Sequence, residues 1–174
     1  MIYFIRHGET DFNLFGISQG NLNTSLNRSG LEQVAQLAKR LKDEPVDKIF
    51  CSPLNRAVQT ALAINKYHDA PICFDDRLAE MAKGKLQGNI NPQKVYNKFY
   101  KNPHKYGGET IEDVYARVKS FWDDLQKYKG KNIMVVSHGV IYRHFKFCYE
   151  NRDIKTEKVS RDQLKNCEVK FFEF

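Results

Sequence analysis

The chain has 174 residues, of which 41% are hydrophobic and 28% are charged, and its net charge is +7. These values are typical of one globular domain with a buried core, which we expect to span residues 1–174, and they exclude an intrinsically disordered chain. No apolar run approaches the ~18 residues of a membrane span, and four scattered cysteines match no zinc or redox motif. We therefore expect a soluble, cytoplasmic protein with reduced thiols, no signal peptide and no membrane partner.

Short apolar runs recur along the chain and predict five strands. The first four are 1–5, 46–51, 71–74 and 132–137, and 167–172 predicts the last one. Longer segments with helical periodicity separate most of these runs. Strands that alternate with helices predict an α/β fold, namely a three-layer sandwich in which helices cover both faces of a mostly parallel sheet.

Apolar residues at helical spacing predict helices over 31–41 and 109–128. The first of these has a candidate N-cap at Asn27 or Ser29. A third helix is expected over 53–67, with its opening proline in the first turn.

Residues 81–108 form a basic segment between the third strand and the long helix. It contains no acidic residue and six lysines: Lys83, Lys85, Lys94, Lys98, Lys101 and Lys105. A local excess of this kind indicates an anionic partner, although a solvated helix face is the alternative. Aromatic residues interleave with the lysines, as in surfaces that stack single-stranded nucleic acid. We favour a cap or lid over an anionic substrate and regard nucleic acid as an unlikely partner.

Polar residues follow three of the predicted strands. Arg6 and His7 come directly after the first strand, Arg56 follows the second, and His138 and Gly139 follow the fourth. Ligands bind at the carboxyl ends of parallel strands, so these side chains are expected to meet there. Guanidinium groups bind phosphate oxygens and an imidazole can attack phosphorus, so the pattern predicts a phosphate site. Gly139 has no side chain, so a bound group can approach the backbone closely there.

An ordered set of motifs extends this pattern along nearly the whole chain. Its members are Arg6-His7-Gly8-Glu9-Thr10, Asn13, Gly16, Gln19-Gly20, Thr24, Leu26, Gly30, residues 52–61, Leu78, Glu80, Gly84, Leu86-Gln87-Gly88, Gly107-Gly108-Glu109 and residues 135–139. This set resembles the histidine phosphatase superfamily, which contains cofactor-dependent phosphoglycerate mutases and many small phosphatases. A lone Arg-His-Gly tripeptide would be weak evidence, whereas the ordered set is specific.

The resemblance implies a role for each matching residue. His7 would be the nucleophile that forms a phosphohistidine, and Arg6 and Arg56 would hold the phosphoryl oxygens. His138 would be a further donor to these oxygens, and Asn13 would contact phosphate. Gly139 falls in the same phosphate-binding motif as His138. The resemblance implies neither a metal nor a cofactor.

Glu80 would be the general acid that protonates the leaving alkoxide and then the base that activates water. This role requires its carboxyl group to carry a proton when substrate is bound. Glu9, which lies next to the nucleophile, is the alternative acid.

The resemblance leaves the reaction open between three possibilities. We expect a phosphomonoesterase that hydrolyses a small anionic phosphate ester, similar to the alpha-ribazole and broad-specificity phosphatases. A cofactor-dependent phosphoglycerate mutase is the alternative, but Met81-Ala82-Lys83 replaces the substrate-binding residues of mutases, and only 18 residues separate Gly88 from Gly107. A non-catalytic module that binds phosphorylated ligands is the third. The sequence selects neither the substrate nor the oligomeric state.

Overall fold

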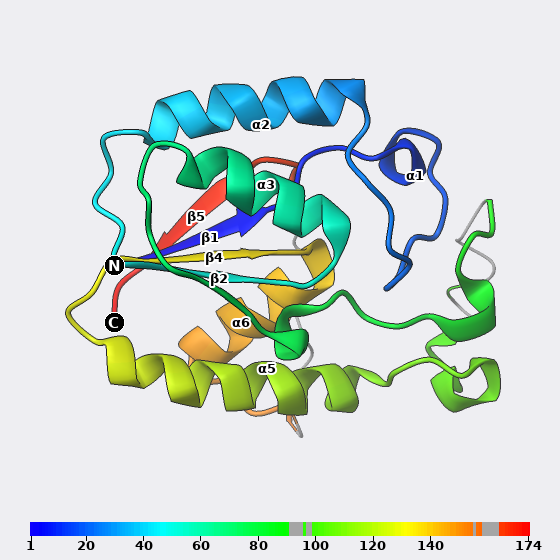
Figure 1. The fold of residues 1–174 in the computed structure, drawn as a ribbon. Coiled ribbons are helices and arrows are strands. Elements are labelled where there is room, and N and C mark those ends of the chain that lie inside the picture. Colours follow the sequence, from blue (N-terminus) through cyan, green and yellow to red (C-terminus); the bar gives the residue numbers. More distant parts are fainter. Residues whose placement is uncertain (91–95, 97–98, 155, 158–163) are drawn as a thin grey trace.

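A five-stranded sheet forms the centre of the computed structural model, which describes residues 1–90, 96, 99–154, 156–157 and 164–174 (Figure 1). The strands in chain order are β1 (Ile2–Arg6), β2 (Lys48–Cys51), β3 (Ile72–Phe74), β4 (Ile133–Ser137) and β5 (Val169–Phe172). Their order across the sheet is β3-β2-β4-β1-β5. The pairings are parallel except that of β5, which runs antiparallel to β1. All five predicted strands are confirmed, with ends that differ by two residues at most.

Helices lie on both sides of this sheet, as Figure 1 shows. The helices α2 (Arg28–Leu41) and α3 (Asn55–Asn65) cover one face, and α5 (Ile111–Leu125) and α6 (Gly139–Tyr149) cover the other. A single turn, α1 (Asp11–Leu14), follows β1. The three-layer α/β architecture is therefore confirmed.

Alternate side chains of the central strands enter two separate cores. In β1, Ile2 and Phe4 pack in the core beneath α5 and α6, whereas Ile5 packs in the core beneath α2 and α3. In β4, Val135 and Val136 divide in the same way. Because successive side chains of a strand point to opposite faces, an apolar run without polar alternation requires a sheet covered on both sides.

The helix ends are set by local hydrogen bonds. Asn27, rather than Ser29, is the N-cap of α2, and its side chain accepts a hydrogen bond from the amide of Gly30 at 2.7 Å. Thr110 caps α5 in a reciprocal arrangement with Asp113. The predicted helix over 109–128 therefore contains α5 and the 3₁₀ turn that follows it.

The start of α3 differs from the prediction. Leu54 is the N-cap and the helix begins at Asn55, so Pro53 lies before the helix rather than in its first turn. The amide of Asn55 instead donates to the side chain of Asn23 at 2.7 Å. This distant partner satisfies a helix-end donor, so the proline is not needed at the first helical position.

Two further observations bear on the class of protein. Within the part of the chain that the structure describes, no helix is long and apolar enough to cross a membrane. All four cysteines are free, and Cys51 and Cys148 are buried.

Candidate active site

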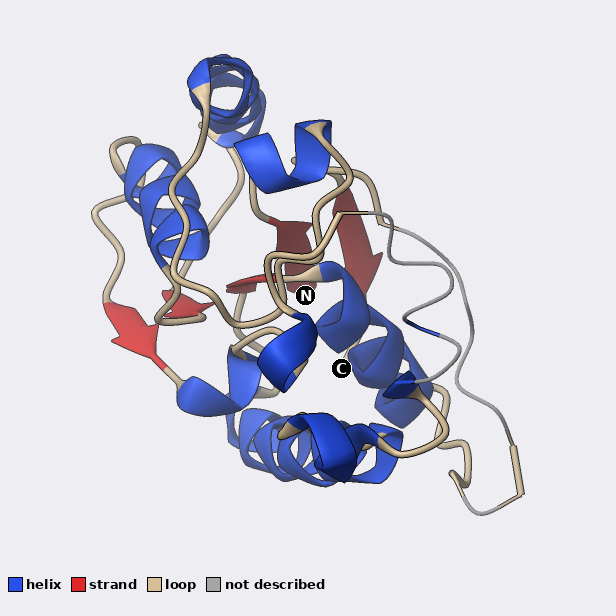
Figure 2. Ribbon diagram, turned by 90° about the vertical axis from the view of Figure 1, so that its right-hand side faces the viewer, coloured by secondary structure: helices blue, strands red, loops and turns tan. Residues whose placement is uncertain are grey.

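Four of the predicted site residues meet where the parallel strands end. Arg6 closes β1 and His7 follows it, Arg56 lies in the first turn of α3 after β2, and His138 is the N-cap of α6 after β4. Figure 2 views the molecule from this end. The ring centroids of His7 and His138 are 5.1 Å apart. His7 is 2% exposed, and Arg56 and His138 are fully buried.

The surroundings of His7 select one tautomer and keep the ring neutral. Its Nδ1 lies 2.7 Å from the carbonyl oxygen of Gly8. A carbonyl only accepts, so Nδ1 carries the proton and Nε2 keeps its lone pair. Burial, followed by the positive charges of Arg56 and Arg6, lowers the pKa of His7 well below its ordinary value of 6.5. The site therefore holds an unprotonated ring nitrogen at neutral pH.

The loop after His7 packs closely against the start of α2. A Cβ at Gly30 would overlap the carbonyl oxygen of Glu9, so only glycine fits there. The carboxylate of Glu9 accepts a hydrogen bond from the side chain of Asn27 at 3.0 Å. Glu9 is thus engaged with the cap of α2, which favours Glu80 as the acid of the site.

The two arginines are held by backbone carbonyls and keep unpaired donors. Arg56 donates through Nη1 to Leu22 at 2.7 Å and through Nη2 to Gly20 at 2.8 Å. Arg6 donates through Nη1 to the carbonyl oxygen of Leu164. In both residues the buried Nε has no hydrogen-bond partner among the described residues. Burial lowers the pKa of Arg56 to about 10, which leaves its guanidinium charged at pH 7.

His138 is neutral for the same reasons as His7. Burial, then the charge of Arg56, lowers the pKa of His138 well below 6.5. Its Nε2 lies 2.7 Å from the hydroxyl oxygen of Ser52, and its buried Nδ1 has no partner within the described chain. An unpaired buried nitrogen is costly, so this ring is suited to a further hydrogen bond with a bound group.

Glu80 lies near both arginines. Its negative charge opposes the lowering of the pKa of Arg6 and of Arg56. One carboxylate oxygen accepts from the amide of Met81 at 2.9 Å, and the other accepts from the amide of Val140 in the first turn of α6 at 3.4 Å. The structure therefore places Glu80 beside the same strand ends as the histidines.

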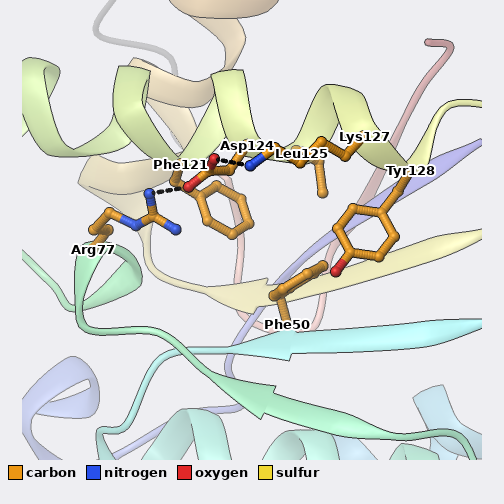
Figure 3. A pocket seen from close by; sticks show the side chains of 7 residues that line it. All are labelled: Phe50, Arg77, Phe121, Asp124, Leu125, Lys127 and Tyr128. Atoms are coloured by element: carbon orange, nitrogen blue, oxygen red, sulfur yellow. Dashed lines mark hydrogen bonds and ion pairs between the residues drawn. The ribbon is translucent and has the colours of Figure 1, made fainter.

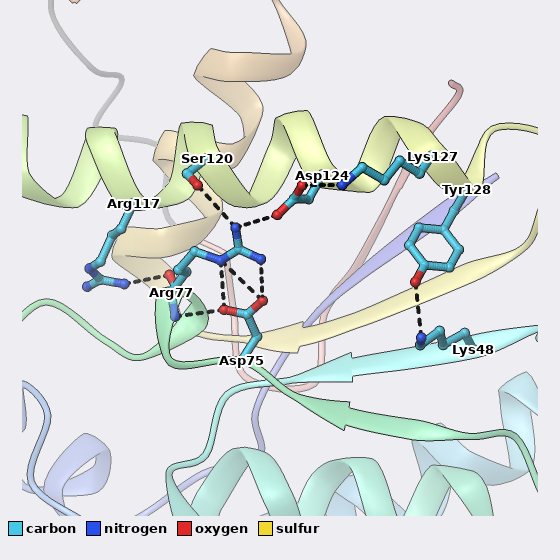
Figure 4. Close-up of polar contacts among 8 residues, drawn as sticks. All are labelled: Lys48, Asp75, Arg77, Arg117, Ser120, Asp124, Lys127 and Tyr128. Carbon is cyan, nitrogen blue, oxygen red and sulfur yellow. Dashed lines mark hydrogen bonds and ion pairs between the residues drawn. The ribbon is translucent and has the colours of Figure 1, made fainter.

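The ion pair between Arg117 and Glu109 holds the segment that carries Glu80. It makes hydrogen bonds to residues before and after Glu80. Arg117 donates to the carbonyl oxygen of Arg77 at 2.6 Å and to the carboxylate of Glu109 at 2.7 and 3.1 Å. That carboxylate also accepts from the amide of Ala82 at 2.7 Å. The guanidinium of Arg77 in turn binds Asp75, Ser120 and Asp124 (Figure 4).

Asn13 belongs to the loop that follows β1, residues 7–13, which we call the histidine loop, and Gly139 begins α6. The side-chain oxygen of Asn13 accepts from the amide and hydroxyl of Thr10, which caps α1. Gly139 opens α6, and the atoms nearest to a Cβ built there belong to the guanidinium of Arg6 at 3.8 Å. Asn13 therefore contacts the loop, and Gly139 lies beside the guanidinium of Arg6 without a side chain that would approach it.

The described part of the basic segment 81–108 packs against the loop after α1. The amide of Gly88 donates to the carbonyl oxygen of Ser18 at 2.8 Å, and Ile17 forms a β-bridge with Ile90. Lys94 and Lys98 lie outside the described residues. Phe99 is fully buried. A buried ring offers no face for stacking a base, so packing rather than nucleic-acid binding accounts for this aromatic residue.

Sequence reasoning missed the contacts made by residues near the end of the chain. Asn166 donates to the carbonyl oxygens of His7 and Gly8, and Leu164 binds Arg6. No spacing or motif links these residues to a loop that lies more than 150 positions earlier. Ser52 belongs to one of the matched motifs, but the motif does not reveal that its hydroxyl contacts His138.

A separate cavity of about 210 Å³ opens between β2 and α5 (Figure 3). Its lining contains no predicted site residue and consists of Phe50, Arg77, Phe121, Asp124, Leu125, Lys127 and Tyr128. Among the residues that the structure describes, no group of three His, Cys, Asp or Glu side chains could hold a metal ion. The histidine and arginine cluster is therefore the candidate site.

Comparison with known proteins assigns the chain to a family. The family model described as "Histidine phosphatase superfamily (branch 1)" matches residues 2–174. The chain belongs to this superfamily. The resemblance found in the motifs is confirmed over almost the full length, which includes both histidines and both arginines.

Several relatives of the chain are named phosphatases. "Phosphoserine phosphatase 1" of Hydrogenobacter thermophilus is 32% identical over 82% of this chain and 72% of that protein. The solved phosphoserine phosphatase of Entamoeba histolytica, in complex with 3-phosphoglyceric acid, has a TM-score of 0.80 and 25% identity, with 97% of this chain and 87% of that one covered. A mycobacterial glucosyl-3-phosphoglycerate phosphatase shares the fold, with a TM-score of 0.84, 23% identity and coverage of 97% and 88%. The family match and the two phosphoserine phosphatases support phosphomonoesterase activity for the chain.

Proposed function

We propose that this protein hydrolyses a small anionic phosphate monoester through a phosphohistidine on His7. The observation that carries the proposal is the hydrogen bond from Nδ1 of His7 to Gly8, which leaves an unprotonated Nε2 beside two buried guanidinium groups. A neutral imidazole is a nucleophile that needs no separate base.

In the first step, the lone pair on Nε2 of His7 would attack phosphorus while the bond to the ester oxygen breaks. Negative charge on the phosphoryl oxygens would be held by Arg6, Arg56 and His138. Nε of each arginine and Nδ1 of the histidine are buried and have no partner among the described residues. They support this assignment because an oxyanion would supply the acceptors that these nitrogens lack there. Asn13 and the backbone at Gly139 would complete the phosphate contacts.

Glu80 would donate a proton to the departing ester oxygen. In the second step it would accept a proton from water, which attacks phosphorus and breaks the bond to Nε2, so that inorganic phosphate leaves and His7 is regenerated. Its position beside Arg6 and Arg56, together with the engagement of Glu9 by Asn27, supports Glu80 in this role.

The segment 81–108 is proposed as a cap that selects an anionic substrate, within a single domain that spans residues 1–174. Its lysines favour a substrate with charge beyond the phosphate. The relatives named phosphoserine phosphatases make phosphorylated amino acids and small phosphorylated acids the first substrates to screen. A cytoplasmic location is proposed from the four free thiols, which persist in a reducing compartment.

Turnover of nitrophenyl phosphate in the presence of a metal chelator tests the proposal. We expect activity in the wild type, a loss on the order of 10⁴-fold or more in His7→Ala, and an acid-labile, alkali-stable phosphoenzyme that only the wild type forms. A folded wild-type protein that binds phosphate esters without turnover would indicate a binding module. Interconversion of 2- and 3-phosphoglycerate that depends on bisphosphoglycerate would indicate a mutase.

A further inference from the structure

A turn at residues 164–167 contacts the loop that carries the proposed nucleophile. This loop, residues 6–13, includes the histidine loop described above and is called the catalytic loop here. The carbonyl oxygen of Leu164 accepts from Arg6, and the amide of Cys167 donates to the carbonyl oxygens of Arg6 and His7 at 3.1 and 3.3 Å. Between them, the side chain of Asn166 reaches into the loop. This turn is therefore in contact with both the proposed nucleophile and a proposed phosphate ligand.

Three acceptors of the catalytic loop surround the side-chain amide nitrogen of Asn166. Its Nδ2 lies 2.9 Å from the carbonyl oxygen of His7, 3.2 Å from that of Gly8 and 3.3 Å from the side-chain oxygen of Asn13. An –NH₂ group is a donor only, and its two hydrogens are shared among these three acceptors, so the contacts require the amide nitrogen to face the loop.

The contact with Gly8 bears directly on the nucleophile. The same carbonyl oxygen accepts from Nδ1 of His7, and that bond determines which ring nitrogen is free. A second donor on this carbonyl fixes its orientation, and a fixed carbonyl in turn fixes the plane of the imidazole. A partner that orients the other ring nitrogen is also how proteins aim histidines that ligate metals.

The contact with Asn13 bears on phosphate binding. The side-chain oxygen of Asn13 already accepts from Thr10, and Asn166 adds a further donor to the same oxygen. With its oxygen engaged in this way, the amide of Asn13 is left to donate through Nδ2. Asn166 thereby reinforces the orientation of the Asn13 amide that Thr10 also favours, with Nδ2 of Asn13 available to a phosphate.

We propose that Asn166 is a positioning residue that fixes the tautomer and ring plane of His7 and reinforces the amide orientation of Asn13. The inference rests on the proposed function, since it assigns Asn166 to the phosphoryl-transfer step. The opposing interpretation is that Asn166 only stabilises the turn 164–167.

The variants Asn166→Ala and Asn166→Asp, with Glu168→Ala as a matched control, distinguish these interpretations. The Glu168 side chain accepts from the amide of Lys165 at 2.7 Å and so holds the same turn, but none of its side-chain hydrogen bonds is to the catalytic loop. We expect Asn166→Ala to slow phosphoenzyme formation from nitrophenyl phosphate ~10- to 100-fold, with KM changed less than about twofold. Asn166→Asp should lose more at neutral pH, because a carboxylate faces three acceptors, and recover partly as acid restores its proton.

A second measurement does not depend on turnover. In protein labelled with ¹⁵N-histidine, Nε2 of His7 should give the signal of an unprotonated nitrogen in the wild type and in Glu168→Ala, and a shifted or averaged signal in Asn166→Ala. An unchanged His7 signal together with wild-type rates, or a rate loss that Glu168→Ala reproduces, would overturn the inference. Absence of a phosphoenzyme in the wild type would instead overturn the proposed function.

Discussion

At the residue scale, the proposed nucleophile depends on burial for its protonation state. An exposed histidine titrates near pH 6.5 and loses nucleophilicity in mild acid. His7 is buried beside Arg6 and Arg56, which disfavour a second proton on the ring. The same burial acts on His138, so the two imidazoles can lie 5.1 Å apart without repelling each other.

A pH profile follows from this protonation state. The single-turnover rate of phosphoenzyme formation from nitrophenyl phosphate should stay level as the pH falls from 7.5 to below 6.5, because the depressed pKa keeps Nε2 of His7 unprotonated there. Rapid-quench measurements at constant ionic strength check this. A rate that halves at pH 6.5 would mean that His7 titrates as an exposed histidine does.

The role of Glu80 predicts a dependence on the leaving group. Glu80→Gln should slow hydrolysis of an alkyl phosphate ~10²- to 10⁴-fold, the usual contribution of a general acid. It should slow release of nitrophenolate far less, because that leaving group departs without a proton. Measurement of kcat/KM on both substrates, with Glu9→Gln as the control, tests the assignment; equal losses in Glu80→Gln would refute it.

At the scale of elements, the close approach of α2 to the histidine loop determines where the loop lies. The N-cap Asn27 binds Gly30 and also Glu9, so one residue both starts the helix and holds the loop. Sequence reasoning named Asn27 and Ser29 as equal candidates. Asn27 is the N-cap, and its side chain also contacts Glu9, which is distant in sequence. Capping preferences are local and do not include such a contact.

Substitution at this contact should affect both stability and activity. In Gly30→Ala, the new Cβ would collide with the backbone oxygen of Glu9, which no side-chain rotation can relieve. We expect a loss of about 2 kcal/mol in the free energy of unfolding and lower activity, since the displaced loop carries His7. Urea denaturation measures the first effect. The exposed neighbour Ser29→Ala should change stability by less than about 0.5 kcal/mol.

The helix α6 shows where periodicity fails as a predictor. Its buried residues, Ile141, Tyr142, His144, Phe145, Phe147 and Cys148, lie on most of its circumference. A helix covered on several sides has no single apolar stripe, so it gives no clear signal of period 3.6. The half-exposed helices α2 and α5 have such stripes and were predicted from them.

At the scale of the whole molecule, burial of neutral histidines makes the fold sensitive to acid. The folded-state pKa values of His7 and His138 lie below the unfolded value near 6.5, so the unfolded chain binds more protons in acid. The two neutral histidines therefore cost no stability above about pH 6.5. Below this pH the free energy of unfolding decreases. The loss approaches about 1.4 kcal/mol per pH unit for each such histidine.

The double variant His7→Asn/His138→Asn tests this linkage. The slope of unfolding free energy against pH, measured by urea titration between pH 6.5 and 5, should be shallower than in the wild type, even if the variant is less stable throughout. His104→Asn, a change in the exposed turn before α5, serves as the control and should leave the slope unchanged. Identical slopes in the double variant and the wild type would contradict the linkage.

The sequence contained the residues that meet at the candidate site but not the contacts that orient them. Arg6, His7, Arg56 and His138 were predictable because each follows a strand, and the ends of parallel strands meet at one edge of a sheet. Asn166 was not, because its contacts with the loop depend on the antiparallel pairing of β5 with β1 and on the turn that precedes β5. Pairings between distant segments follow from the whole fold rather than from local patterns.

The place of β1 between β4 and β5 has a consequence for synthesis on the ribosome. The strand β1, which His7 follows, is translated before the other four, yet both of its neighbours in the sheet are translated more than 125 residues later. The nascent chain must therefore carry β1 as an unpaired apolar segment until β4 and β5 have been translated. The loop after β1 should therefore reach its final position only after residues 164–172 have left the exit tunnel, because those residues contact it.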